Sequence, residues 1–482
     1  MSIGLGFLRV RPSARSLPGC AACLLIGWVV GASRAQASDR PAPDRAAGRA
    51  AYEQQCARCH GETGKGDGVD ATRFYPRPRD LAMGVYKFRS TASGTPPTDE
   101  DLFDTITNGL PGSNMPDWHQ LSEATRWQLV YYLKSLSPVF EQSQPEPIQT
   151  AADPGSGGAD LAKGKVVFDQ LKCAACHGAP GRGDGASAAG LVDDWGMPIR
   201  PANLTQGWSY RGGSDPRAIM LRMLAGIDGT GMPSYAGAVS PEDAWHLAYY
   251  VASLQEPAHW NLIGRAELLD GPLPESPDDP RWERAEPTDV RLRNAVEATG
   301  EWAHPPTIRA VSFRALCNRE AVAFHIWWDD PTQDPQDALA IVLRTAPANG
   351  GPSPGQASSQ GDVVSLQAWP YDGAAALDFC YWSPNAAMVE TVATAYEQLT
   401  VPQRAVAGLS SAVRYVQGRW HLIVQRPLEP EQPAGAASMA HGTLVPVAFV
   451  AWDGGNPPAR AISPWVDVQM GPSADRDATG SH

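Results

Sequence analysis

The chain has 482 residues, of which 39 are Lys or Arg and 52 are Asp or Glu, so its formal net charge is −13 at pH 7. This acidic balance makes it a poor binder of nucleic acid, whose phosphates attract basic surfaces. The charge has two possible meanings: solubility alone, or long-range attraction of a basic partner protein.

The first 37 residues have the pattern of a secretory signal peptide. Three arginines between positions 9 and 15 precede an apolar run over 17–30, and positions 35–37 are Ala-Gln-Ala, a small-x-small cleavage site. A retained membrane anchor is the alternative, although the run is short for a full span. No later stretch is long and apolar enough to cross a bilayer. We therefore expect the mature protein to be exported to the periplasm, with Cys20 and Cys23 lost with the signal.

Two Cys-x-x-Cys-His pentads lie in the first half, Cys56-Ala57-Arg58-Cys59-His60 and Cys173-Ala174-Ala175-Cys176-His177. In this spacing two thiols can add to the vinyl groups of one haem while the next residue supplies an axial imidazole to the iron. Disulfides or a zinc site are the alternative, but a zinc knuckle needs a second Cys or His pair nearby, and neither segment has one. The pentads predict two covalent haem c groups, with His60 and His177 as iron ligands.

A methionine follows each pentad at the same distance. Met115 lies 55 residues after His60, and Met232 lies 55 residues after His177; each is followed by Pro and sits in a Gly-containing loop. A thioether facing an imidazole raises the reduction potential of a haem relative to two imidazoles. We predict Met115 and Met232 as the sixth ligands. The less favoured substitutes are Met83, Met197 and Met223.

The first half is an internal repeat around these motifs. A Gly-x-x-x-aromatic element, Gly48 to Tyr52 and Gly164 to Phe168, precedes each pentad, and a Gly-rich segment follows it. Each unit closes with Trp, Tyr and Leu at helical spacing, over 127–136 and 245–254, after a Ser that suits a helix start. Each unit is therefore expected to be a small helical domain.

Residues from about 46 to 136, and again from about 160 to 254, resemble class I cytochrome c domains. The resemblance implies a few short helices around each haem, with the two His residues as proximal ligands and the two Met residues as distal ligands. It also implies that a proline carbonyl, from Pro78 or Pro201, orients the proximal imidazole. Arg79 could pair with a haem propionate, and Arg200 could do so in the second domain.

The second half of the chain has a different pattern of apolar and turn residues. Short apolar runs with turn residues between them predict an all-β sandwich. The expected strands are 321–328, 363–369, 377–382, 412–416, 420–425 and 447–454, and a Gly/Ser/Pro loop is expected over 350–360.

The predicted organisation is multidomain: two small all-α cytochrome c domains followed by the all-β sandwich. Its parts are a signal peptide (1–37), a first cytochrome c domain (38–140), a linker (141–158), a second cytochrome c domain (159–256), a second linker (257–300), the β sandwich (301–470) and a disordered tail (471–482).

The segments 418–428 and 446–454 are similar to the haem-binding γ subunits of periplasmic molybdenum enzymes of the ethylbenzene and dimethyl sulfide dehydrogenase type, and the similarity covers roughly 301–469. It implies a β sandwich that holds a b-type haem between a Met and a Lys. It also implies electron transfer between molybdenum/iron–sulfur subunits and a soluble or membrane carrier.

The sequence departs from this family at the haem ligands. No lysine follows Lys172, and the segment 370–376, where the family has its Met, contains none. The possible replacements are Met388, Met439, His325 and His421, each more often a packing residue than a ligand. A haem b in this domain is therefore possible but not favoured, and a docking role is preferred.

Cys317 and Cys380 remain outside the haem motifs. In an oxidising compartment they could form a disulfide. Two separate buried thiols are the equal alternative.

The favoured function is a periplasmic dihaem electron-transfer protein without substrate chemistry of its own. It would be the relay subunit of a molybdenum oxidoreductase of the nitrite/nitrate, chlorate, selenate, dimethyl sulfide or hydrocarbon type. Expected partners are the molybdenum/iron–sulfur subunits and a soluble or membrane cytochrome or terminal oxidase of a respiratory chain. The alternatives are a dihaem enzyme, such as a peroxidase or thiosulfate dehydrogenase, and a cytochrome with a carbohydrate- or surface-binding module.

Overall fold

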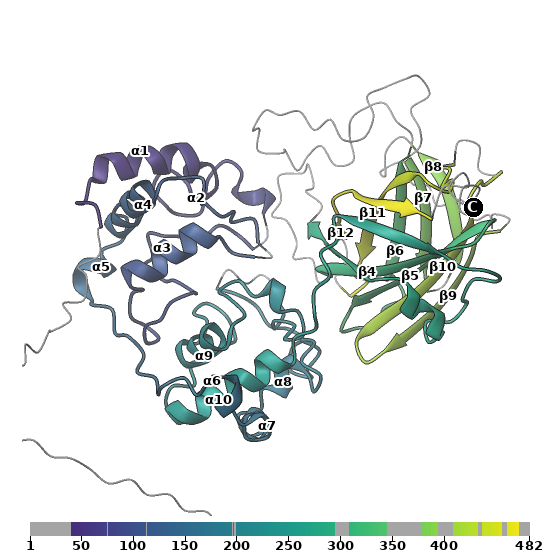
Figure 1. Ribbon diagram of the computed structural model, residues 1–482. Coiled ribbons are helices and arrows are strands. Elements are labelled where there is room, and N and C mark those ends of the chain that lie inside the picture. Colours follow the sequence, from purple (N-terminus) through teal and green to yellow (C-terminus); the bar gives the residue numbers. More distant parts are fainter. Residues whose placement is uncertain are drawn as a thin grey trace, which may run out of the picture. The chain divides into compact units, whose positions relative to one another are not determined.

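The structure is a computed structural model (Figure 1). Several expectations lie outside the residues it describes: the signal peptide, the strand over 363–369, the loop over 350–360, Met197 and the tail beyond 471. Within the described residues, no helix has the length and apolar character needed to cross a membrane. The described residues are 40–74, 76–111, 113–194, 196, 199–294, 308–344, 377–384, 386–393, 408–431, 436–455 and 460–471.

The first cytochrome unit is built from short helices, as expected. Ser122 begins α4 by accepting from the backbone N–H of Thr125, and Thr98 begins α3 with a reciprocal capping box. Trp127, Leu129, Val130 and Leu133 of α4 are buried in the core of this unit. Its elements are α1 (Arg45–Gln55), α2 (Ala57–His60), η1 (Ala71–Arg73), α3 (Asp99–Asn108), α4 (Glu123–Ser135) and α5 (Val139–Gln142).

The second unit repeats this plan. Ser240 begins α10 by accepting from Asp243 N, with Pro241 at the first helical position. Its elements are α6 (Gly155–Gly158), α7 (Leu161–Gln170), α8 (Ala174–His177), η2 (Gly207–Ser209), α9 (Pro216–Ala225) and α10 (Pro241–Ser253).

The Gly-x-x-x-aromatic element of each repeat is a helix-packing site. A Cβ at Gly48 of α1 would overlap the carbonyl oxygen of Gln128 in α4, and a Cβ at Gly164 of α7 would overlap that of His246 in α10. Glycine therefore lets the first and last helices of each unit approach closely. The aromatic residues one turn later, Tyr52 and Phe168, are 0% and 2% exposed.

The segment 141–158, expected as a linker, is largely irregular but is not free. Ala92 N donates to Glu146 O at 2.8 Å and Ile148 N donates to Ser90 O at 3.0 Å. Nε1 of Trp245 donates to Ala151 O at 2.9 Å. The segment is thus hydrogen-bonded to both cytochrome units.

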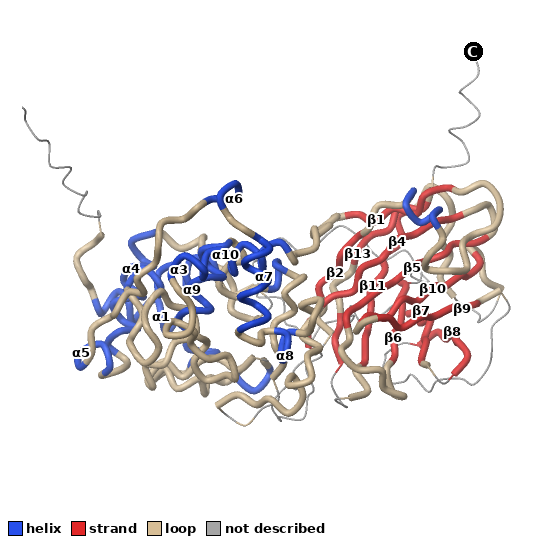
Figure 2. The backbone as a smooth tube through the Cα atoms, turned by 90° about the horizontal axis from the view of Figure 1, so that it is seen from below, coloured by secondary structure: helices blue, strands red, loops and turns tan. Residues whose placement is uncertain are grey.

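The strands of the C-terminal half form one continuous hydrogen-bonded sheet, in the order β8-β7-β6-β11-β13-β1-β4-β5-β10-β9 (Figure 2). The bounds are β4 (Ala310–Cys317), β5 (Ala321–Asp329), β6 (Ala338–Arg344), β7 (Leu377–Ser383), β8 (Ala386–Ala393), β9 (Ser410–Val416), β10 (Arg419–Pro427), β11 (Leu444–Trp452), β12 (Arg460–Ile462) and β13 (Val466–Met470).

This sheet curls so that non-neighbouring strands face each other. The rings of Trp328 in β5 and Trp382 in β7 are 5.9 Å apart, and those of Trp382 and Trp420 in β10 are 5.2 Å apart. All three belong to one large buried core. The all-β prediction is confirmed, but the separate sheets of the expected sandwich are replaced by a single barrel-like sheet.

The sheet also begins earlier than the sequence indicated. The segment 257–300, expected as a linker, contains β1 (Ile263–Leu268), η3 (Pro280–Arg284), β2 (Thr288–Arg291) and β3 (Arg293–Asn294). Strand β1 pairs in parallel with both β4 and β13. Clusters of Pro and Asp lie between these short strands, and they give the segment the composition of a linker.

Candidate haem sites

The first pentad lies on a single helical turn. Cys56 caps α2, and His60 ends it. Nδ1 of His60 lies 3.0 Å from the carbonyl oxygen of Arg79. Burial lowers the pKa of His60, although the bond to Arg79 acts against this. A neutral imidazole that donates from Nδ1 leaves Nε2 free, which is the state required of an iron ligand.

The second pentad has the same geometry. Nδ1 of His177 lies 2.9 Å from the carbonyl oxygen of Ala202, and burial lowers the pKa of this histidine too. The predicted acceptors, Pro78 and Pro201, are therefore wrong by one residue in each domain. Both proline carbonyls instead face the Gly-rich segment, where a Cβ at Gly66 or Gly183 would lie 2.5 or 2.9 Å away from them.

The loops that carry the two methionines are also alike. Leu110 N donates to Met115 O at 3.0 Å, and Ile227 N donates to Met232 O at 3.0 Å. The methionine N–H groups donate to Ser113 Oγ and Thr230 Oγ1, each at 3.2 Å. The two methionine loops, which lie at equal distances from their pentads in the sequence, thus have the same pattern of backbone hydrogen bonds.

In the first domain, Cys56, Cys59, His60 and Met115 line one cavity. The structure therefore brings together the residues that the sequence selected for the first haem. Apolar side chains form much of the remaining wall, among them Leu81, Leu102, Ile106, Leu129 and Leu133.

Two polar atoms in this cavity support the fit of a haem. The hydroxyl of Tyr86 and Nε1 of Trp118 are shielded from solvent and have no hydrogen-bond partner among the described residues. Both residues line the cavity. Buried donors are normally satisfied, so each needs an acceptor that the described residues do not supply. A haem carries two propionates that would serve.

The cysteine thiols of the pentads lie in low-polarity surroundings. Burial, followed by the charge of Cys59, raises the pKa of Cys56 to about 12. Burial is also the main cause that raises the pKa of Cys173 to about 11. An uncharged thioether suits such a wall better than a thiolate does.

In the second domain, Cys173 and Met232 both pack against the domain core. Of the substitute methionines, Met223 is buried in α9 within this core, whereas Met83 of the first domain is 62% exposed.

The two arginines that were expected to pair with haem propionates, Arg79 and Arg200, have different surroundings. Arg79 lines the cavity of the first domain. In the second domain, Nη2 of Arg200 lies 3.1 Å from Oδ2 of Asp453 in the β domain, so this guanidinium already has an acidic partner in the structure.

The candidate haem b ligands of the β domain lie in its core or contact each other. Met388 and Met439 are buried in the sheet core and pack there as apolar residues. His325 and His421 bond to each other, with Nε2 and Nδ1 3.1 Å apart. Burial lowers the pKa of His325 to about 3 and that of His421 to about 4, so the pair is neutral. They line a cavity of about 370 Å³ that is also walled by Trp327, Arg314 and Trp208.

Cys317 and Cys380 are separate buried thiols in the structure. Cys317 Sγ lies 3.5 Å from Ala266 O and 4.0 Å from Nδ1 of His441. Of the two alternatives that the sequence left open, the structure has the unpaired one.

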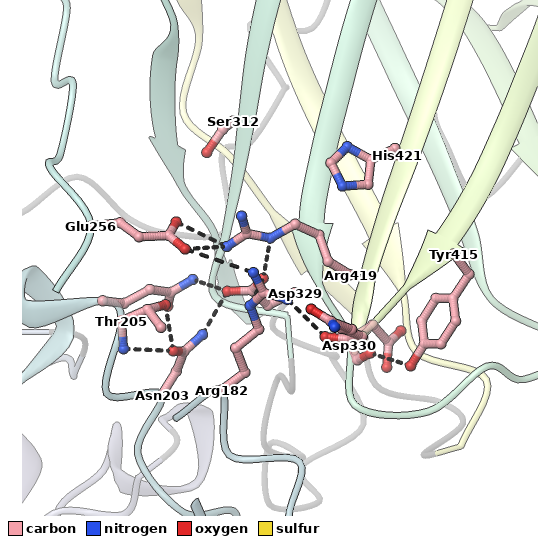
Figure 3. A network of polar contacts seen from close by, with 12 residues as sticks. Arg182, Asn203, Thr205, Glu256, Ser312, Asp329, Asp330, Tyr415, Arg419 and His421 are labelled. Carbon is pink, nitrogen blue, oxygen red and sulfur yellow. Dashed lines mark hydrogen bonds and ion pairs between the residues drawn. The ribbon is translucent and has the colours of Figure 1, made fainter. Parts of the chain in front are cut away.

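A polar network between the second cytochrome domain and the β domain was not predicted (Figure 3). Asp329, at the end of β5, accepts from Arg419 Nε at 2.6 Å and from Asn203 Nδ2 at 2.6 Å. Arg419 also pairs with Glu256 at 3.0 Å, and Arg182 approaches both acids at 3.8 Å. Each pair in this network joins residues at least 74 positions apart in the sequence, so no local pattern could have predicted the contacts.

Comparisons with known proteins identify both helical units. Residues 43–133 match the family described as cytochrome c oxidase, cbb3-type, subunit III, and residues 161–255 match the cytochrome c family. The cbb3-type cytochrome c oxidase subunit CcoP of Azospirillum sp. (strain B510) is 30% identical over 222 residues, which are 43% of this chain and 62% of that protein. The thiosulfate dehydrogenase of Stutzerimonas stutzeri (strain A1501) is 27% identical over 214 residues, with the same coverage.

Among solved structures, a chain of the Kuenenia stuttgartiensis reducing HAO-like protein complex Kustc0457/Kustc0458 is 40% identical, with a TM-score of 0.42 over 45% of this chain and 100% of that one. A carbohydrate binding module family 9 of Caldicellulosiruptor kristjanssonii in complex with glucose is 10% identical, with a TM-score of 0.27 over 44% of this chain and 97% of that one.

The chain spans about three fifths of the length of the curated relatives that it matches. Two consecutive family matches, each covering one pentad and its methionine loop, account for the helical half. The helical half therefore contains two cytochrome c domains, and these domains imply the covalent binding of haem c.

Proposed function

We propose that the protein is a periplasmic electron relay with no substrate chemistry of its own. Cys56, Cys59, Cys173 and Cys176 hold the two haems, His60 and His177 are their proximal ligands, and Met115 and Met232 close the sixth positions. Each haem, when bound, supplies one-electron redox chemistry. The protein's part is to fix the ligands and to exclude other molecules from the iron.

The observation that carries this proposal is that His60 and His177 each make the same kind of hydrogen bond, from Nδ1 to a backbone carbonyl oxygen. In each domain a backbone carbonyl fixes the imidazole as a neutral ring with Nε2 free. In the first domain the methionine lies in the wall of the same cavity as the histidine. An iron with two protein ligands has no open position for a substrate, so transfer of electrons is the chemistry that remains.

The β domain is proposed to dock the relay onto molybdenum/iron–sulfur subunits of a periplasmic oxidoreductase. The support is the γ-subunit resemblance, whose two segments form strands β10 and β11. The absence of lysine after Lys172, the core positions of Met388 and Met439 and the His325–His421 pair favour docking over haem b binding. A soluble or membrane cytochrome or terminal oxidase is the proposed partner at the other end of the relay.

An enzyme is the second candidate. The relative from Stutzerimonas stutzeri carries the name thiosulfate dehydrogenase and is 27% identical over 214 residues. Such an activity needs one iron with a displaceable sixth ligand. The matched methionine loops make this the less favoured proposal.

Carbon monoxide binding to the dithionite-reduced protein separates the two proposals. The relay predicts no rapid binding at either haem and no thiosulfate-dependent reduction. Rapid binding of one equivalent of carbon monoxide, together with thiosulfate turnover, would contradict the relay proposal and support the enzyme proposal. Pull-down from the native periplasm, followed by molybdenum analysis of the eluted complex, tests the docking proposal separately; a molybdenum-free eluate in which the protein is alone would contradict it.

A further inference from the structure

Four aspartates converge at one end of the β domain. Asp330 follows β5, Asp334 and Asp337 lie in the loop before β6, and Asp453 follows β11. Asp330, Asp337 and Asp453 are 0%, 0% and 3% exposed, and their ligand atoms lie within 4.8 Å of one another. Buried carboxylates this close repel one another strongly unless a cation or protons compensate them.

The hydrogen bonds of this group are incomplete. Oδ1 of Asp330 accepts from Thr332 N at 3.2 Å, but Oδ2 is buried and has no partner among the described residues. Oδ2 of Asp334 is in the same state. A fully buried carboxylate oxygen without a donor is rare in native proteins and indicates a missing ligand.

Two glycines let the two loops bring these oxygens together. A Cβ at Gly455 would lie 2.6 Å from Oδ2 of Asp334 and 3.2 Å from both Oδ1 of Asp453 and Oγ1 of Thr332. A Cβ at Gly454 would lie 2.8 Å from Asp337 N. Oxygens from both loops therefore crowd one small space that any larger side chain would fill.

A second buried acidic group in the same domain shows how charge is compensated elsewhere. Asp378 and Glu390 both pair with Arg426, at 3.2 and 2.7 Å, and all three side chains are 1% exposed or less. In the four-aspartate group, Arg200 pairs with Asp453, and its side chain is 28% exposed, so this contact is more open to solvent than the Arg426 pairs are.

Two of these carboxylates are in surroundings that disfavour their charged form. Burial, followed by the charges of Asp453 and Asp337, raises the pKa of Asp330 to about 8. Burial also raises the pKa of Asp337.

We propose that Asp330, Asp334, Asp337 and Asp453 bind one Ca²⁺ ion. The donors are all hard oxygen atoms, with no imidazole or thiol among them, which suits calcium and not zinc or copper. Ligands from separate loops and the neighbouring Thr332 hydroxyl allow the irregular, high coordination that calcium accepts and magnesium does not.

The position of this site ties calcium to the second cytochrome domain. Asp453 pairs with Arg200, two residues before the Ala202 carbonyl that holds His177. Asp330 follows directly on Asp329, which accepts from Asn203 and Gln206 of the same cytochrome domain. Calcium is therefore expected to stabilise the contact between the two domains as well as the loops that bind it.

The test uses the purified haem-loaded protein after dialysis against EDTA. Calorimetric titration with Ca²⁺ should show one site per chain with a Kd between about 0.1 and 1 mM, as in extracellular calcium modules. The melting temperature of the β domain should rise with Ca²⁺, and Mg²⁺ should bind more weakly. No binding heat and no shift in melting temperature would overturn the proposal.

Variants locate the site. Asp330→Asn keeps the size of the side chain and removes a ligand charge, so it should weaken Ca²⁺ binding by at least about tenfold. Asp278→Asn removes an exposed carboxylate of the same domain and should bind as the wild type does. Asp334→Asn, at a less buried position, replaces Asp330→Asn if that variant does not fold. Wild-type affinity in the aspartate variant, or equal loss in Asp278→Asn, would overturn the assignment.

Discussion

Nδ1 of His177 lies 2.9 Å from the carbonyl oxygen of Ala202, and the next residue, Asn203, donates from Nδ2 to Asp329 at 2.6 Å. The acceptor that orients the second haem's histidine is thus one residue from the anchor on the β domain. In the first domain, the corresponding acceptor is Arg79. The β domain is therefore in a position to influence the haem of the second domain.

Asp329→Ala should shift the reduction potential of one haem only. The substitution removes the partner of Arg419, Asn203 and Gln206 from a place where the aspartate side chain is 9% exposed. Burial alone would lower the pKa of Arg419, but Asp329 and Glu256 together raise it, so this guanidinium depends on its acidic partners. Loss of a buried partner should destabilise the domain contact by about 3 kcal/mol.

Potentiometric titration followed at the haem bands, with urea unfolding of the same samples, checks this prediction. Asp278→Asn, whose exposed ion pair with Arg414 lies elsewhere on the β domain, is the control and should leave both potentials unchanged. Equal shifts of both haems in Asp329→Ala would show that the anchor acts on the whole protein and not on His177.

Replacement of Met115 or Met232 should leave one haem iron without its sixth ligand. Met115→Leu and Met232→Leu remove a thioether while keeping an apolar side chain of similar volume. Each variant should lose the sulfur–iron absorption band of one haem and should bind one equivalent of carbon monoxide. The reduction potential of that haem should change by on the order of 0.1 V or more, which is within the range that axial ligands set. Met83→Leu, at a surface position, should change none of these.

The two remaining cysteines should be unreactive in the folded protein. Cys317 and Cys380 are both 0% exposed, and burial raises the pKa of Cys317 to about 11 and that of Cys380 well above its ordinary value. A thiol reagent should therefore titrate no free thiol in the native holoprotein and two after denaturation. Zero thiols after denaturation would show that the two cysteines form a disulfide.

Asp378 should make the β domain less stable as the pH rises towards neutrality. Burial raises the pKa of Asp378 to about 7, with Arg426 acting to lower it and Glu390 to raise it. The folded-state pKa lies above the ordinary value of 3.8. The folded protein therefore keeps a proton that the unfolded chain releases between about pH 4 and pH 7, and the free energy of unfolding falls as pH rises through this window, by up to about 1.4 kcal/mol per pH unit from this group.

Asp378→Asn removes this contribution, because an amide does not titrate. Relative to the wild type, the variant should gain stability between pH 4 and pH 7, while Arg426 keeps Glu390 as its partner at 2.7 Å. Urea unfolding at several pH values measures the difference. A stability difference that stays constant across the window would contradict the raised pKa.

The haem sites were largely predictable because their information is local. The pentads, the Ser residues that begin α4 and α10, and the methionine loops are each encoded within a few residues, and their repetition confirms each copy by the other. The exact carbonyl acceptor was missed by one residue because the sequence does not show how the Gly-rich segment packs.

What the sequence could not predict depends on long-range pairing. Arg200 was expected near a haem, but Asp453, 253 positions later, is its partner. Strand β1 is recognisable only through its parallel partners β4 and β13, which come from distant segments. The four-aspartate site likewise forms only when the loops after β5 and β11 meet.

Haem content per chain is the most direct test of the central claim. The pyridine haemochrome spectrum and intact mass of the exported protein should show two covalently attached c-type haems. The double variant Cys56→Ala/Cys59→Ala, and separately Cys173→Ala/Cys176→Ala, should each retain one. A colourless protein, or one whose haem content is unchanged by either double variant, would contradict the account.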